Sequence, residues 1–326
     1  MQPFSYAEAS TLPSAVDLAS THEAMFIAGG TDMLQLLQED VLSPATLVGI
    51  GRLPLAGVEV DADGARIGAM ARLSAVADDT RIQQHFPLLA EALMATASPQ
   101  VRNMATVGGN LLQRTRCLYF RDRTAPCNKR QPGSGCGAMD GQNRMNAILG
   151  GSKSCIAAYP GDMAVALVAL DATIEVRGRQ GPRHVKVADL HVPPGDTPQI
   201  ETTLRRGEII TAIRIPRNAF AAGSHYLKVR DRASFEWALV SVAVGLECDG
   251  DSVRAARVVA GGVGTVPWRL RNVEERLRGH RLDREQAHAA GQIAAEGADP
   301  RPGNTYKVRL LQNAVERALM IAGGLL

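Results

Sequence analysis

The chain has few aromatic residues, little net charge and no long apolar run. Only 4% of its 326 residues are Phe, Trp or Tyr, which argues against a surface that stacks nucleic-acid bases. Lys and Arg number 36 against 33 Asp and Glu, an excess too small and too dispersed to indicate a polyanionic partner. The longest clean apolar run, residues 163–170, is far shorter than the roughly 20 residues that cross a bilayer. We therefore expect neither a nucleic-acid partner nor a membrane span.

An export signal and a disulfide framework are also missing from the pattern. The first ten residues contain no basic region followed by an apolar stretch, so no secretory signal is expected. A partner subunit that carries a signal could still export the chain. The five cysteines are an odd number, and a chain of this length needs no disulfide staples. What remains is the composition of a globular protein with about two domains, at a prior of ~150 residues each.

Strand and helix patterns alternate irregularly along the chain. Apolar runs predict strands near residues 25–28, 45–50, 57–60, 66–70, 173–177, 184–187, 209–215, 225–229, 238–247 and 252–259. Helical periodicity predicts helices near residues 14–20, 73–79, 85–97, 164–170, 272–278, 283–296 and 304–322. A stretch of small residues at 217–224 marks a domain boundary. This mixed order indicates an α+β fold in two or three lobes.

Four of the five cysteines lie in one polar window that shows neither helical nor strand periodicity. The window is on the order of 40 residues long, and an ordered loop of that length needs a function or a cross-link. Its spacing is neither that of zinc ribbons nor that of bacterial ferredoxins. Apolar burial is not expected to hold the window, whereas thiolates on a cluster or a metal could. The four cysteines are Cys117, Cys127, Cys136 and Cys155.

The surroundings of these cysteines favour a cluster or a metal over ordinary free thiols, which stay the alternative. Basic side chains can offset thiolate charge, and glycines can turn backbone N–H groups toward sulfur. The basic residues are Arg116, Arg121, Arg123, Lys129 and Arg130, and the glycines are Gly133, Gly135 and Gly137. The fifth cysteine, Cys248, ends an apolar run and is expected to be an ordinary strand-end residue.

Two glycine turns suit the binding of a bulky phosphate-containing group. The first, AGGTD at residues 28–32, joins a predicted strand to a predicted helix whose N-terminal N–H groups suit a pyrophosphate. Thr31 or Asp32 would cap that helix, and the Asp32 carboxylate is not expected to touch a phosphate. The second turn is TVGGN at residues 106–110, where the Asn110 side chain is expected to fix the turn. Either turn alone is also consistent with a plain structural turn.

Taken in order, these motifs resemble the FAD-binding medium subunits of the molybdenum hydroxylases, the family of xanthine dehydrogenase and carbon-monoxide dehydrogenase. The similar stretches are FIAGGTDMLQLL, SPQVRNMATVGGNLL, YPGDMAVALVALDATIEV, YLKVRDRASFEWALVSVAV and GGVGTVPWRLRNVE. They span essentially the whole chain. The cysteine window resembles the insertion found in the subgroup whose flavin subunit carries an additional [4Fe–4S] cluster, such as the bacterial periplasmic aldehyde oxidoreductase.

The resemblance implies a fold and a division into domains. Residues 1–218 would form an α+β, two-lobed FAD-binding domain of the PCMH or vanillyl-alcohol-oxidase-like type. Its subdomains would cover about 1–55 and 56–218, with the cluster loop inserted at about 113–158. Residues 224–326 would form the smaller α+β C-terminal domain of the molybdenum hydroxylase flavoprotein type.

The resemblance also implies the residues that bind cofactors. Those expected to contact FAD from the first lobe are Phe26, Ile27, Ala28, Gly29, Gly30, Thr31, Asp32, Met33 and Leu34. Those expected from the remainder of the chain are Thr106, Gly108, Gly109, Asn110, Asp162, Ile210 and Lys228. The family pattern places the [4Fe–4S] ligands at Cys117, Cys127, Cys136 and Cys155 and leaves out Cys248.

The implied function is that of an electron-transfer subunit with FAD and a [4Fe–4S] cluster. Its partners would be a large molybdenum-cofactor subunit that oxidises an aldehyde and a small [2Fe–2S] subunit. Such a chain needs no acid–base pair or nucleophile of its own, and we single out no catalytic residue. We expect a periplasmic location by co-export with a signal-bearing partner, with the cytoplasm as the alternative. The alternative functions are a stand-alone FAD oxidoreductase and an interaction module with a structural four-cysteine zinc.

Overall fold

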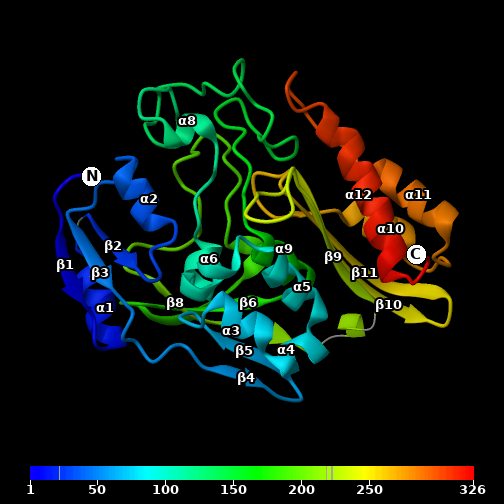
Figure 1. Cartoon of the computed structure of the whole chain (residues 1–326), viewed down its shortest axis with the longest axis horizontal. Helices are drawn as coiled ribbons and strands as arrows, with labels where there is room; N and C mark the ends of the chain where they lie inside the picture. Colours follow the sequence, from blue (N-terminus) through cyan, green and yellow to red (C-terminus); the bar gives the residue numbers. More distant parts are fainter. Residues whose placement is uncertain (22, 218, 222) are drawn as a thin grey trace.

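The described part of the chain contains three β-sheets, each associated with helices. The computed structural model describes residues 1–21, 23–217, 219–221 and 223–326. In Figure 1 the N-terminal sheet lies at the left, the C-terminal sheet and its helices lie at the right, and the largest sheet runs along the base. The predicted domain boundary at residue 218 falls on a residue outside the described part of the chain.

The first sheet contains three parallel strands. The order is β1 (Ser5–Glu8), β3 (Thr46–Gly49), β2 (Ala24–Ile27), so β3 pairs with both neighbours. Two helices accompany this sheet, α1 (Leu12–Ala19) and α2 (Met33–Gln38). Because α2 follows β2 after a short turn, that turn lies beyond the carboxyl end of a parallel strand, a common place for ligands in parallel sheets.

The second sheet is antiparallel and has five strands. Their order is β4 (Val58–Val60), β5 (Gly64–Gly68), β8 (Ile209–Pro216), β6 (Thr173–Gly178), β7 (Gly181–Lys186). The strands predicted near 57–60 and 66–70 pair as an antiparallel hairpin, and the Asp61 side chain accepts hydrogen bonds from two backbone N–H groups of the β4–β5 turn. Strand β8 lies at the centre of this sheet, between β5 and β6, although it is the last of the five strands in the chain. Its pairing with both neighbours therefore joins the beginning and the end of the second lobe.

A series of short helices joins the second sheet to the rest of the chain. They are α3 (Leu73–Asp78), α4 (Thr80–His85), α5 (Pro87–Ala95), α6 (Pro99–Met104), α7 (Val107–Leu111), α8 (Leu118–Arg121) and α9 (Asp162–Ala169), with the 3-10 turn η1 (Val187–Asp189). The single helix predicted at 85–97 is wrong at its start. Pro87 opens a new helix, and Phe86 before it adopts non-helical angles, as residues before proline tend to.

The C-terminal sheet is antiparallel with the order β12 (Trp268–Arg269), β11 (Ser252–Gly261), β10 (Val240–Asp249), β9 (Ser224–Val229). Helices α10 (Arg271–Leu277), α11 (Arg284–Gln292) and α12 (Tyr306–Ala322) lie beside it, with the 3-10 turns η2 (Ala219–Ala221) and η3 (Ile293–Ala295). Helix α9 is buried along its whole length and contacts α5, β10 and β11, so it packs the second lobe against the C-terminal domain.

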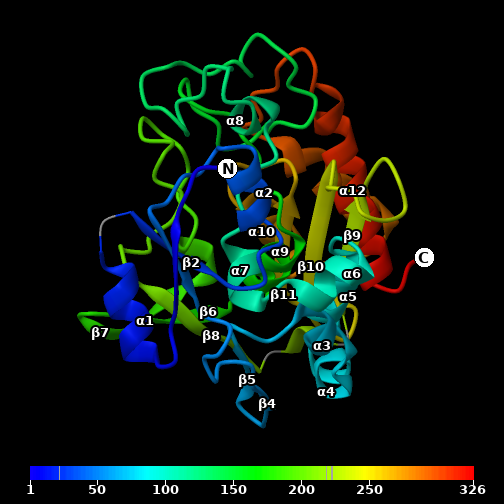
Figure 2. The same ribbon diagram turned by 60° about the vertical axis from the view of Figure 1, so that its left-hand side comes forward.

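Residues 113–158, here called the cysteine loop, extend above the first lobe and lie near α2 and α12 in two views (Figures 1 and 2). Contrary to expectation, apolar burial helps to hold this loop. Phe120 is fully buried against Leu36, Val41 and Cys127.

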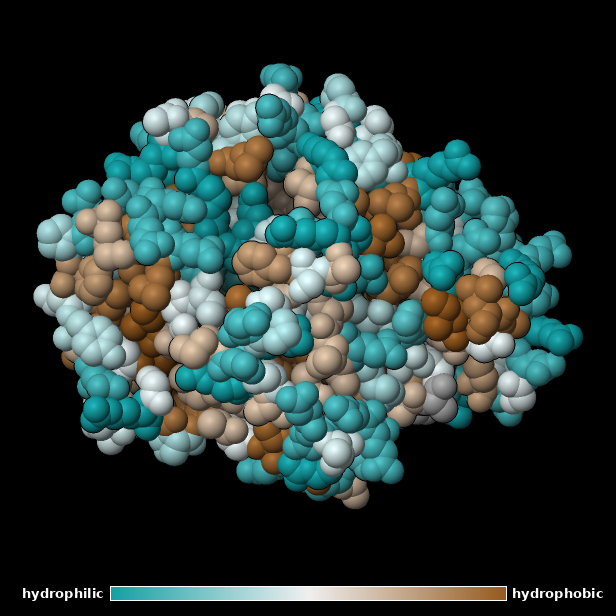
Figure 3. Space-filling model, in the orientation of Figure 1, coloured by the Kyte–Doolittle hydropathy of each residue, from teal (hydrophilic) through white to brown (hydrophobic). Residues whose placement is uncertain are grey.

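Figure 3 shows a mostly hydrophilic face with separate apolar patches. In the described part of the chain, no helix is both long and apolar enough to cross a bilayer.

Candidate functional site

A cavity of about 770 Å³ opens where the two lobes, the cysteine loop and the C-terminal domain meet. Its volume lies in the range of small-molecule and cofactor sites. The walls come from residues 24–33, 35 and 36, from the segments around α6 and α7, from the start of β8 and from the segment before β10. Five arginines and four carboxylates line it, so the cavity can receive a phosphate-bearing ligand with charge-assisted hydrogen bonds.

The AGGTD turn forms one wall and makes its glycines necessary. A side chain on Gly29 would overlap the Met104 carbonyl oxygen of the second lobe, so only glycine allows the two lobes to come this close. Gly30 has a φ of +73°, in the left-handed region that favours glycine. The turn therefore presents bare backbone to the cavity, as predicted.

Asp32 behaves differently from the prediction that Thr31 or Asp32 caps α2. Its side chain makes no capping hydrogen bond. Instead, Oδ1 accepts from Arg116 Nη1 at 2.5 Å and Arg121 Nη2 at 2.8 Å, and Oδ2 accepts from the Arg114 backbone N–H at 2.7 Å. Burial acts to raise the pKa of Asp32, but these donors outweigh it and hold the pKa below its usual value. The carboxylate is therefore charged and its charge is fully compensated.

The TVGGN motif is a short helix rather than a turn, which corrects a second prediction. Thr106 caps α7 by accepting from the Gly109 N–H at 3.3 Å, and neither glycine of the motif has a positive φ. Gly108 instead allows close packing, because a Cβ there would lie 3.0 Å from the Ala69 Cβ. The Asn110 side chain does not fix the motif. Its Oδ1 is buried without a hydrogen-bond partner among the described residues, in the wall of the cavity.

The structure gathers most of the predicted FAD contacts around this one cavity. Those that line it are Phe26, Ile27, Ala28, Gly29, Gly30, Thr31, Asp32, Met33, Thr106, Gly108, Gly109, Asn110 and Ile210. Those that do not are Leu34, Asp162 and Lys228. The Leu34 residue is 45% exposed on the outside of α2. Direct contact of each residue with FAD stays a prediction.

Asp162 and Lys228 form a buried ion pair behind the cavity. Lys228 Nζ lies 2.8 Å from Asp162 Oδ2 and donates also to the Ala95 carbonyl, while the Tyr226 hydroxyl donates to Asp162 Oδ1 at 2.8 Å. Both charged side chains are only 3% exposed. Burial raises the pKa of Asp162, and the hydrogen bonds from Lys228 and Tyr226 oppose that effect. The pair ties the start of α9 to strand β9, across the interface between the two domains.

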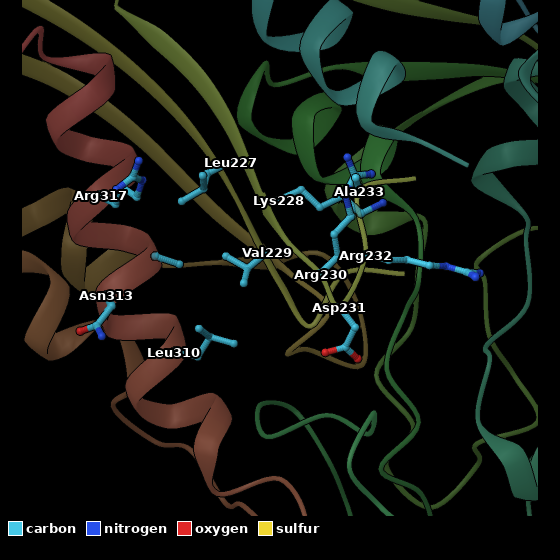
Figure 4. Close-up of a pocket in the computed structure, with 11 residues that line it drawn as sticks. Leu227, Lys228, Val229, Arg230, Asp231, Arg232, Ala233, Leu310, Asn313 and Arg317 are labelled. Atoms are coloured by element: carbon cyan, nitrogen blue, oxygen red, sulfur yellow. The ribbon is translucent and has the colours of Figure 1, made fainter. Parts of the chain in front are cut away.

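Strand alternation explains why Lys228 faces away from the C-terminal helices. Leu227 and Val229 point toward α12 and line a separate groove of about 530 Å³ between β9 and α12 (Figure 4). Lys228 lies on the opposite side of the strand, where Asp162 receives it (Figure 4). Arg317 of α12 also lines the groove, whereas Arg230 donates to the Ala95 carbonyl at 3.1 Å, as Lys228 does.

Among the lining residues that sequence reasoning did not place at the cavity are Arg116 and Trp237. The Arg116 guanidinium lies 4.3 Å from the centroid of the Trp237 ring, and both residues line the cavity. Such stacking of a guanidinium on an indole is favourable. Trp237 is one of only two tryptophans in the chain, and that rarity within a recognised motif was a usable signal.

The cysteine loop brings its four thiols into one region. Cys127 and Cys136 face each other in an antiparallel bridge. The Asn128 side chain, next to Cys127, donates to the Ser154 carbonyl, next to Cys155, at 3.1 Å. N–H groups point at two of the sulfurs: Asn146 Nδ2 lies 3.5 Å from Cys117 Sγ, and the Ala157 N–H lies 3.4 Å from Cys155 Sγ.

Most of the basic residues expected to neutralise the thiolates are engaged elsewhere, which corrects that expectation. Arg116 and Arg121 pair with Asp32, Arg123 pairs with Asp40, and Arg130 donates to backbone carbonyls. Lys129 pairs with Glu201 but still acts electrostatically on Cys155.

The loop glycines also act differently from the prediction. The N–H groups of Gly133 and Gly135 point to the Asn128 side-chain oxygen, and that of Gly137 points to a carbonyl, so none of the three donates to sulfur.

Burial raises the pKa of Cys117 and raises that of Cys155 to about 11. Within the described ranges, no three His, Cys, Asp or Glu side chains are close enough together to hold a single metal ion. Cys248 is exposed at the end of β10, apart from the loop.

The fold and this cavity define the class of protein. Residues 2–218 match the family described as the FAD binding domain in molybdopterin dehydrogenase. Residues 225–322 match the family described as the CO dehydrogenase flavoprotein C-terminal domain. The chain therefore belongs to the FAD-binding flavoprotein subunits of the molybdenum hydroxylases, and the predicted resemblance and α+β fold class are confirmed.

Individual relatives make the similarity more specific. The chain is 42% identical over 323 residues to the aldehyde oxidoreductase FAD-binding subunit PaoB of Escherichia coli K12, covering 98% of both chains. It is 28% identical to the glyceraldehyde dehydrogenase medium chain of Sulfolobus acidocaldarius, covering 86% of this chain and 83% of that one. A crystal structure of quinoline 2-oxidoreductase from Pseudomonas putida 86 matches with a TM-score of 0.77 over 99% of this chain and 98% of that one. At 24% identity that match supports the fold alone.

Proposed function

We propose that this chain is the FAD- and [4Fe–4S]-containing electron-transfer subunit of a heterotrimeric molybdenum aldehyde oxidoreductase. The observation that carries the proposal is the junction of the FAD cavity with the cysteine loop, where Arg116 lines the cavity and Cys117 follows it directly. The similarity along the full length to a subunit named for aldehyde oxidoreductase supports the substrate class.

The residues of the cavity fit FAD. The turn at Gly29 and Gly30 lines the cavity without side chains, and Asn110 Oδ1 offers a buried hydrogen-bonding atom without a partner in the described part of the chain. The arginines of the wall suit a pyrophosphate. FAD, when bound, supplies transfer of electrons singly or in pairs, while the protein contributes binding, orientation and electrostatics. The chain's own part is thus to hold and orient the cofactor and to shield it from water.

The donor set of the cysteine loop fits an iron–sulfur cluster. Cys117, Cys127, Cys136 and Cys155 are free thiols on one loop, and Cys127 faces Cys136 in an antiparallel bridge. Asn146 and Ala157 already direct N–H groups at two of the sulfurs. Hydrogen bonds of this kind tune cluster potentials.

We propose as partners a large molybdenum-cofactor subunit and a small [2Fe–2S] subunit, because relatives are named as medium subunits or chains. Periplasmic location by co-export stays a prediction of the sequence, with the cytoplasm as its alternative. Affinity purification of the tagged chain from its source cells, after separation of periplasm from cytoplasm, tests the partners and the location together.

The decisive experiment is quantification of FAD, iron, acid-labile sulfide and zinc in the full-length chain purified without oxygen. One FAD with about four iron and four sulfide supports the proposal. FAD with about one zinc and no sulfide would make the cysteine loop structural. A folded chain with neither FAD nor iron would refute the proposal. Aldehyde turnover by the isolated chain would favour a stand-alone oxidoreductase instead.

A further inference from the structure

One carboxylate of the glycine turn holds the segment around Cys117. Asp32 accepts hydrogen bonds from Arg116 and Arg121, which flank Cys117 in the sequence, and from the backbone of Arg114. The three donors lie 82 to 89 positions from Asp32, so tertiary packing alone brings them together. All of these side chains are largely buried, with exposed fractions of 16% for Asp32, 18% for Arg116 and 13% for Arg121.

Further contacts carry this arrangement to Cys117 itself. Arg121 Nε donates to the Thr115 carbonyl at 3.1 Å, and the Cys117 backbone N–H donates to Thr115 Oγ1 at 3.2 Å. Asp32 therefore fixes Arg121, Arg121 fixes Thr115, and Thr115 fixes the backbone that carries the thiol. Few conformations of Cys117 are compatible with all of these contacts at once.

The same carboxylate faces the FAD cavity. Asp32, Arg116 and Arg121 all line that cavity, and Arg116 is also stacked on Trp237 from the C-terminal domain. Two guanidinium groups lie against the Asp32 carboxylate, and the Glu39 carboxylate lies 3.5 Å from Arg121, so the charges of this cluster balance. The like-charge argument against a phosphate near Asp32 therefore does not hold in the folded protein.

We propose that Asp32 is a positioning residue that couples the two cofactor sites, so that filling the FAD cavity orders the Cys117 segment and ordering that segment strengthens FAD binding. This inference rests on the proposed function. Any such coupling is reciprocal, because a ligand that favours one arrangement of the arginines must itself be favoured by that arrangement.

The test compares Asp32→Asn with a matched control, Asp40→Asn, in the full-length chain. Asp40 also pairs with an arginine of the cysteine loop, Arg123, but does not line the cavity. Chain prepared without iron or FAD is alkylated with iodoacetamide, with and without added FAD, and the rate at each cysteine is measured by mass spectrometry. The exposed Cys248 is the internal reference. FAD affinity is measured by fluorescence titration of the same samples.

In the wild-type chain and in Asp40→Asn, saturating FAD should slow alkylation of Cys117 by roughly tenfold and leave Cys248 unchanged. In Asp32→Asn, that protection should disappear, and the Kd for FAD should rise by roughly tenfold, which corresponds to about 1.4 kcal/mol. If Asp32→Asn binds FAD with the affinity of the wild type and FAD still slows the alkylation of its Cys117, the coupling is refuted.

A second variant keeps the test informative if Asp32→Asn fails to fold. Arg121→Gln removes the same contact from the side of the loop and leaves the glycine turn intact. It should abolish the protection of Cys117 as well, and retention of full protection in this variant would also overturn the inference. Failure of the proposed function looks different, because the wild-type chain itself would then bind no FAD.

Discussion

The buried lysine of helix α12 offers the sharpest test of how the C-terminal domain holds the cysteine loop. Lys307 is fully buried, and its Nζ donates to the carbonyls of Met145, Asn146 and Gly262 at 3.2, 3.1 and 2.7 Å. Two of these carbonyls belong to the cysteine loop, and Asn146 is the residue whose side chain reaches Cys117. Replacement of Lys307 by Met keeps most of the volume but removes the titratable amine and its hydrogen bonds to these carbonyls.

The structure fixes the sign and size of a pH effect at this residue. Burial lowers the pKa of Lys307 from 10.5 to about 7, with a smaller contribution from Arg144. Between pH 7 and 10.5 the unfolded chain therefore carries a proton on this residue that the folded chain has released. Stability rises with pH wherever the unfolded state binds more protons. Between pH 7 and pH 9, the free energy of unfolding of the wild type should therefore rise by about 2 kcal/mol relative to that of Lys307→Met.

Urea denaturation followed by tryptophan fluorescence at pH 7 and pH 9 measures this difference. Lys153→Met, which removes an exposed lysine of the same loop, should follow the wild type at both pH values. If the difference in free energy of unfolding between the wild type and Lys307→Met is the same at both pH values, Lys307 keeps its proton in the folded state. The reasoning from burial would then be refuted.

Three further outcomes follow from the site and its surroundings. Asp162→Asn should lower the free energy of unfolding by about 3–5 kcal/mol because it leaves a buried ammonium unpaired. The control Asp231→Asn, in an exposed ion pair, should change the free energy of unfolding by at most ~1 kcal/mol. Equal urea midpoints for the two variants would contradict this. Gly29→Ala should raise the Kd for FAD at least tenfold (about 1.4 kcal/mol) in a fluorescence titration, and the open-space control Gly57→Ala should not. Burial lowers the pKa of His191 from 6.5 to about 4, so stability should fall by about 2–3 kcal/mol as the pH drops from 6.5 to 4, and His191→Phe should abolish that loss.

The fold could be predicted where one element carries its own pattern. The long strands β10 and β11 and the helix α12 show periodicity over ten or more residues, and they lie where the sequence places them. The four-residue strand β1 was missed because most of it is exposed and it exists only through its pairing with β3. The short helix α8 was missed for a related reason, since its burial depends on Phe120 meeting α2.

The part of the candidate site that could be predicted is the glycine turn, because paired glycines in a sequence indicate backbone that must lie close to another group or adopt a positive φ. Gly29 and Gly30 pointed to a bare turn at the cavity because only backbone geometry and close approach explain them. The buried pair of Asp162 with Lys228 was not predictable from spacing, because the two residues lie 66 positions apart and on different domains. A family motif names such residues without saying that they bind each other.

Charge near a cysteine turned out to be the least transferable signal, and the reason is physical. A basic side chain stabilises a thiolate only if no carboxylate is closer, and a sequence with nearly balanced charges offers many carboxylates. Arg116, Arg121 and Arg123 each found one in the first lobe, so they anchor the cysteine loop instead of neutralising its sulfurs. Burial raises the pKa of the Cys117 and Cys155 thiols, which therefore stay protonated in the metal-free chain, and a bound cluster would itself have to supply the charge that deprotonates them. Assembly at this loop should therefore release protons.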